Sequence, residues 1–161
     1  MSNLVEYCKQ DAIDSMEHFL RNFSHVPDDK LNWSPTPTSK SALQIAAHTA
    51  ITIANFTKMI QDRRLPFGDE ISEFMAETAA REAAISTREE AVELFQQNVD
   101  AVLTAMDELT EDELELVLDS GQGWQMPMTF LVKLPGRHTA WHIGQIDFLQ
   151  TCWDDQEIYV G

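Results

Sequence analysis

The chain has 161 residues, with 27 acidic and 11 basic side chains and a net charge of −16. So few cations among so many carboxylates argue against nucleic-acid binding, which needs a basic face along the phosphates, and against an anionic membrane surface. Hydrophobic residues make up 43% of the sequence, which is enough for a core. We therefore expect one acidic domain over residues 1–161. Because no leader pattern or membrane-spanning apolar run is visible, we expect it to be soluble and cytoplasmic.

Four segments carry the apolar period of an amphipathic helix. They span about residues 2–24, 39–61, 87–107 and 127–153. Capping boxes, in which a hydroxyl residue is followed three positions later by Gln or Glu, mark two of the starts. The pairs are Ser41 with Gln44 and Thr87 with Glu90.

The rest of the chain connects these helices. Residues 70–83 predict a short acidic helix, and residues 115–118 and 124–126 flank a glycine-rich turn, which makes a small hairpin possible. Pro127 suits the first position of a helix, and Pro135 predicts a bend in the last helix.

The connection between the second and third helices predicts the topology. Adjacent antiparallel helices need only about two to eight residues between them, whereas about 25 residues intervene here. A helix of about 20 residues is about 30 Å long, so this connection can run the length of the molecule and let both helices point the same way. We expect an all-α fold, a four-helix bundle with crossover (up-down-down-up) topology.

Two of the five histidines stand four residues apart in the last helix. Four residues make about one helical turn, so His138 and His142 project from the same face. Leu131, Leu134 and Leu149 share that face, which predicts that both imidazoles point into the bundle. Each buried neutral imidazole needs a partner for its acceptor nitrogen, and a shared divalent cation is one solution. Separate hydrogen bonds to polar neighbours are the other.

His48 lies in the middle of the second helix, on the side of Ile45 and Ile51. Three inward histidines with no evident fourth protein ligand are the number expected of a catalytic site that keeps coordination positions open. We therefore predict the metal ligands His48, His138 and His142; the alternative is three separate core histidines. Four polar residues could orient the imidazoles or be ordinary polar lining. They are Gln44, Thr52, Asn55 and Gln145.

The segment from His138 to Asp147, in which Gly144-Gln145-Ile146 follows the second histidine, resembles the DinB-like (YfiT-like) superfamily. His48 on an earlier helix and the Leu31–Pro35 segment upstream of it fit the same pattern, so the resemblance covers about residues 31–155. It implies a crossover bundle, often dimeric, in which these three histidines bind a divalent metal ion. Characterised relatives include transferases and isomerases that use thiols such as bacillithiol, mycothiol or glutathione.

These observations favour an enzyme, a divalent-metal-dependent transferase of the thiol-dependent type with a three-histidine site. The bound ion would hold a thiol as its thiolate, and no GxSxG nucleophile motif competes with this interpretation. Two alternatives stay open: a metal-dependent hydrolase, in which the same position activates water, and a non-catalytic metal-binding or interaction bundle. The sequence identifies no catalytic residue besides the ligands.

The expected cofactor is a divalent metal ion. Zinc and nickel come first, and iron or manganese also suits imidazole ligands. The expected partners are a small-molecule substrate such as a low-molecular-weight thiol and, by the resemblance, a second copy in a homodimer. Arg137 and Trp141 adjoin the ligands and are candidates for contacts with the substrate or the dimer partner. Further candidate interface aromatics are Trp124, Phe130 and Trp153.

Overall fold

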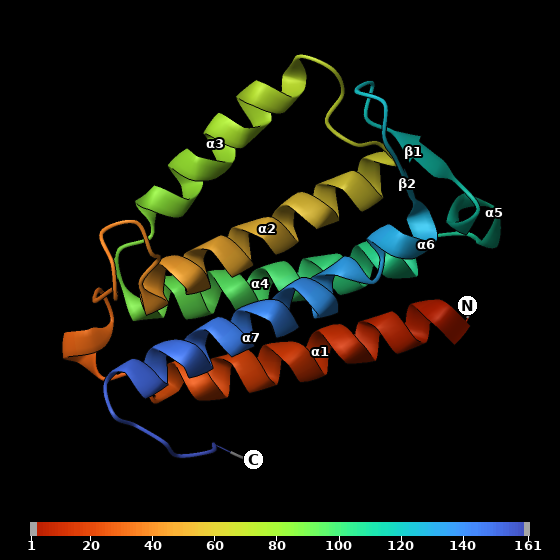
Figure 1. Ribbon diagram of the computed structural model, residues 1–161. Helices are drawn as coiled ribbons and strands as arrows, with labels where there is room; N and C mark the ends of the chain where they lie inside the picture. The colour runs from red at the N-terminus through yellow and green to blue at the C-terminus, as the bar shows by residue number, and fades with distance from the viewer. Residues whose placement is uncertain (1–2, 160–161) are drawn as a thin grey trace.

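The computed structural model describes residues 3–159. Four long helices lie side by side along the molecule (Figure 1). They are α1 (Asn3–Ser24), α2 (Ala42–Asp62), α4 (Arg88–Asp107) and α7 (Leu134–Cys152). Both α1 and α2 contact α4 and α7, which closes the ring of four helices around one core. The predicted four-helix bundle is confirmed.

The direction of each helix confirms the crossover topology. Helices α1 and α7 run one way along the bundle, and α2 and α4 run the other way (Figure 1). Helix α3 (Glu70–Ala84) leads the chain back along the bundle from the end of α2 to the start of α4. Because α3 makes this return, α2 and α4 can lie side by side and parallel.

Both predicted capping boxes form. The Ser41 hydroxyl accepts a hydrogen bond from the backbone N–H of Gln44, and the side chain of Gln44 accepts one from the backbone N–H of Ser41. Thr87 and Glu90 make the same reciprocal pair at the start of α4. Each box satisfies backbone donors that the first turn of a helix leaves without partners.

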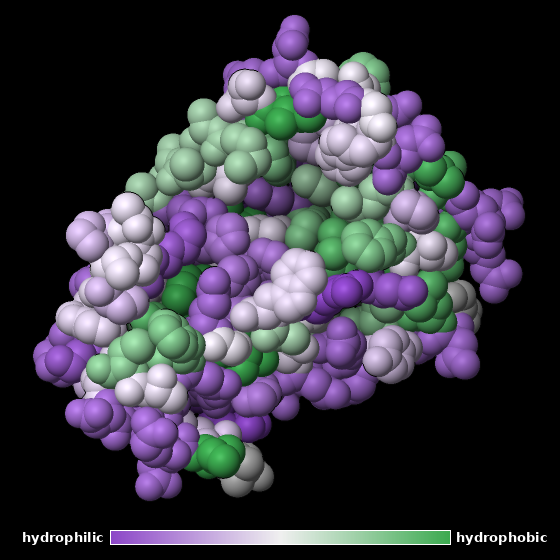
Figure 2. Space-filling model, in the orientation of Figure 1, coloured by the Kyte–Doolittle hydropathy of each residue, from purple (hydrophilic) through white to green (hydrophobic). Residues whose placement is uncertain are grey.

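Helix α3 stands apart from the bundle core. Its contacts are chiefly with α2, and Thr78 is its buried residue. Figure 2 shows that the side of α3 on this face is mildly hydrophobic, and that the surface is hollowed between α3 and the bundle. Residues of α2, of α3 and of the loop that joins them line a cavity.

Short elements fill the connection between α4 and α7. Strands β1 (Val117–Asp119) and β2 (Gln125–Pro127) form an antiparallel hairpin, which the sequence indicated as possible, with Leu118 opposite Met126. Three further short helices were not predicted. They are the 3-10 helix η1 (Asp28–Lys30), α5 (Glu111–Leu114) and α6 (Met128–Leu131).

The predicted single helix over 127–153 is wrong at its start. Pro127 belongs to β2 and caps α6, and α7 begins at Leu134, after a break at Val132 and Lys133. Pro135 therefore lies in the first turn of α7, where its missing N–H costs no helical hydrogen bond. Pro135 therefore lies at the start of α7 and does not bend the helix as expected.

Gly136 lies where α7 packs closely on α1. A Cβ atom at this position would lie 3.0 Å from the backbone carbonyl carbon of Asp11 and closer still to the Asp11 carboxylate. Gly144 on the same helix has no atom within 4 Å of the corresponding position. The two glycines thus offer a matched pair of substitutions.

We expect Gly136→Ala to lower the free energy of unfolding by about 1–3 kcal/mol, because the added methyl group overpacks the α1–α7 contact. Gly144→Ala should raise it by about 0.5–1 kcal/mol, since alanine favours a helix interior. Urea unfolding of the two variants measures both changes. Equal stability of the two variants would contradict the close approach at Gly136.

No helix within residues 3–159 is both long and apolar enough to cross a membrane.

Candidate metal centre

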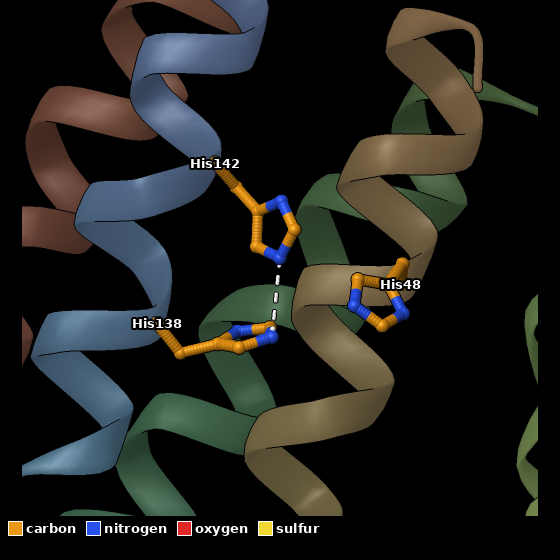
Figure 3. Close-up of side chains that lie close together, drawn as sticks. All are labelled: His48, His138 and His142. Carbon is orange, nitrogen blue, oxygen red and sulfur yellow. Dashed lines mark hydrogen bonds between the residues drawn. The ribbon is translucent and has the colours of Figure 1, made fainter. Parts of the chain in front are cut away.

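The three predicted ligands come together between α2 and α7. His48 projects from α2, His138 and His142 project from successive turns of α7, and the three rings face one another (Figure 3). One nitrogen from each ring can be chosen so that all three lie within 4.8 Å of one another. The Nε2 atoms of His138 and His142 are 3.1 Å apart. This group could hold a metal ion.

The surroundings of the rings differ. His138 is 9% exposed, and the ring of Phe56 packs edge-on against it with 5.7 Å between centroids. His48 and His142 are half-buried, so the site is closed on the core side and accessible on the other. The i, i+4 spacing sets the distance between the two α7 histidines, and the packing of α2 on α7 brings in the third.

Two of the imidazoles are oriented by hydrogen bonds from the ring nitrogen that faces away from the group. His48 Nδ1 lies 2.7 Å from Glu82 Oε1, and His142 Nδ1 lies 2.6 Å from Gln145 Oε1. Both oxygens accept, so each Nδ1 donates, and the hydrogen bond holds each ring with its Nε2 away from that partner. This is the arrangement in which metal-ligating histidines are usually held.

His138 Nδ1 is buried without a hydrogen-bond partner among the described residues. Its orientation therefore depends on packing against Phe56 and on the contact of its Nε2 with His142.

Burial keeps the two histidines of α7 neutral. Desolvation, with smaller contributions from the charges of His142 and His48, lowers the pKa of His138 to about 3. Desolvation also lowers the pKa of His142. At neutral pH both are unprotonated, which is the form that binds metal ions.

Glu82 was not predicted from the sequence. It lies near the end of α3, and its carboxylate also contacts the ammonium group of Lys40, with 3.4 Å from Nζ to Oε2. No sequence signal distinguishes Glu82 from the other acidic residues in the run Glu70–Glu82. Its carboxylate reaches His48 only because α3 docks on α2. Its side chain is 16% exposed, unlike those of most acidic residues in this helix.

Of the four polar residues for which the sequence left this role open, Gln145 makes such a contact. Gln44 instead belongs to the capping box of α2. Asn55 instead makes hydrogen bonds to α3: its side chain donates one to the Thr78 hydroxyl and accepts one from Arg81. Thr52 is half-buried and makes no side-chain hydrogen bond within residues 3–159.

A cavity of about 390 Å³ lies beside the histidine group. Two of its lining residues connect it to the group: Gln145 contacts His142, and Lys40 contacts Glu82, the partner of His48. Its remaining lining residues are Pro35, Ser39, Ile45, Phe148 and Leu149.

Together the fold and the site define a crossover four-helix bundle with a three-histidine group that could hold a metal ion. The profile of the DinB superfamily matches residues 11–146, a span that includes all three histidines. The chain belongs to the DinB superfamily.

Two solved proteins illustrate the fold. The DinB-like protein YjoA of Bacillus subtilis matches with a TM-score of 0.67 and 15% identity, over 95% of this chain and 96% of its own. A mycothiol-dependent maleylpyruvate isomerase matches with a TM-score of 0.68 and 16% identity, over 91% of this chain. The match covers 63% of the isomerase, so this chain corresponds to only part of that protein. A comparison with curated protein sequences gave no match.

Proposed function

We propose that this protein is a divalent-metal-dependent transferase that acts with a low-molecular-weight thiol, and that His48, His138 and His142 are the metal ligands. The observation that carries the proposal is the convergence of three imidazoles, two of them oriented by hydrogen bonds to Glu82 and Gln145. Membership of the DinB superfamily and the fold shared with a mycothiol-dependent isomerase support a thiol as the reactant.

The residues fit a divalent ion. Three imidazoles supply the nitrogen donors typical of catalytic sites and leave coordination positions for other molecules. An ion held there would act as a Lewis acid that binds a thiol and lowers its pKa. Glu82 and Gln145 hold the rings of His48 and His142, while Phe56 keeps water from the core side of His138. We propose zinc first and nickel next, with iron and manganese as further ions that imidazoles accept.

Cobalt(II) tests both parts of this proposal, because its visible absorption reports ligation. We expect the metal-free protein to take up one equivalent of cobalt, and 2-mercaptoethanol to add a sulfur-to-metal charge-transfer band. The double variant His138→Ala/His142→Ala should show neither signal. Cobalt binding with no band from any thiol would overturn the thiol-dependent reaction and leave the metal site.

We also propose that the protein forms a homodimer. Three of the candidate interface aromatics are exposed, with Trp141 58%, Trp124 47% and Phe130 38% accessible. Trp153 instead packs against Trp33 at the bundle core, with 6.1 Å between ring centroids. Light scattering at micromolar concentration should give twice the mass of the chain, and the mass of one chain would contradict the proposal.

A further inference from the structure

We infer that the cavity beside the histidine group binds a carboxylate of the reacting small molecule, with Lys40 as its charged partner. This inference rests on the proposed function and names the chemical class of its substrate. We refer to this cavity, lined by Lys40, Gln145, Ile45, Phe148 and their neighbours named above, as the Lys40 cavity.

The charge of the Lys40 cavity is unusual for this protein. Lys40 is its one charged lining residue, and no carboxylate lines it, although the chain carries a net charge of −16. Two other cavities of similar size are lined by several carboxylates. They hold Asp62, Glu70, Glu73 and Glu77 in one case, and Asp147, Asp155 and Glu157 in the other.

Lys40 is placed to contact a molecule that binds at the metal centre. Its Nζ lies 3.4 Å from Glu82 Oε2, a long contact, and its side chain is 48% exposed. The other oxygen of Glu82 is held at 2.7 Å by His48 Nδ1. The Glu82 carboxylate is thus shared between the ammonium group and the imidazole, which leaves Lys40 able to bind a second anion.

The local charge balance favours an anion. A divalent ion on neutral imidazoles, together with Lys40 and Glu82, gives a net charge of about +2 at the site. The apolar walls formed by Ile45, Leu149 and the 61% exposed Phe148 strengthen that field and suit a short hydrocarbon arm. One lysine in a cavity of about 390 Å³ matches a small monoanion such as a carboxylate.

The test compares carboxylate and amide forms of the same thiol on cobalt-loaded protein. The probes are 3-mercaptopropionate with 3-mercaptopropionamide, and 6-mercaptohexanoate with 6-mercaptohexanamide, so that two arm lengths are sampled. For each pair, the charge-transfer band gives two dissociation constants and their ratio. A change in metal affinity cancels from this ratio, because every titration starts from loaded protein.

In Lys40→Gln, the preference for the carboxylate is expected to fall by about 5–10-fold for at least one arm length, as expected for a partly exposed charged hydrogen bond. Lys40→Arg should keep the preference, and Lys58→Gln, a lysine of α2 outside the cavity, should leave it unchanged. An unchanged ratio in Lys40→Gln at both lengths overturns this inference alone. If no thiol gives a band with the unmodified protein, the proposed function fails and this inference falls with it.

Discussion

Metal-free protein is expected to lose stability steeply as the pH falls below about 6.5, with His138 as a main cause. Burial and the neighbouring histidines lower the pKa of His138 from 6.5 to about 3 in the folded state. Between these values the unfolded chain binds a proton that the folded protein does not. The stability is therefore complete above the unfolded pKa and is lost as the pH falls toward the folded one, at about 1.4 kcal/mol per pH unit.

Urea unfolding in the presence of a chelator, from pH 7.5 to 4.5, measures this loss. His138→Gln, which cannot be protonated, should reduce the slope below pH 6 by about 1.4 kcal/mol per unit relative to the unmodified protein. His18, an exposed residue of α1, supplies the control His18→Gln. The same slope in the unmodified protein and in His138→Gln would show that the imidazole is not held neutral by burial.

Loss of Glu82 is expected to weaken metal binding by about 10–100-fold, the usual effect of removing the carboxylate behind a ligating histidine. Glu82 accepts a hydrogen bond from Nδ1 of His48 and so holds that ring in its orientation within the group. Glu82→Ala removes the acceptor, whereas Glu82→Gln keeps an oxygen and should cost less.

Competition with a chelating dye gives the dissociation constants. Glu77→Ala is the matched control, since Glu77 is exposed on the same helix and makes no ion pair within residues 3–159. Unchanged affinity in Glu82→Ala would mean that α3 plays no part in the metal centre.

The parts of the fold that could be predicted depend mostly on short-range sequence patterns. The capping boxes at Ser41 and Thr87 fixed two helix starts, because their hydrogen bonds lie within four residues of sequence. Thr110 and Glu113 form a third box before α5, which was missed because that helix has only four residues and no apolar period. Pro127 was misassigned because proline suits both an edge strand and a helix start.

The candidate site could be predicted only in part. The i, i+4 spacing of His138 and His142 defines their common face, and the central place of His48 on an apolar helix suggested the third ligand. Glu82 and Lys40 could not be predicted, since their approach depends on how α3 docks on α2, a tertiary contact without a periodic pattern in the sequence.

Elemental mass spectrometry of untagged protein tests the central claim most directly. The unmodified protein and the control variant His18→Ala/His25→Ala should each carry about one divalent ion per chain. The triple variant His48→Ala/His138→Ala/His142→Ala should carry none. Contradiction would come from equal metal content in the triple variant, or from unmodified protein that holds no metal and takes up neither zinc, nickel, iron nor manganese.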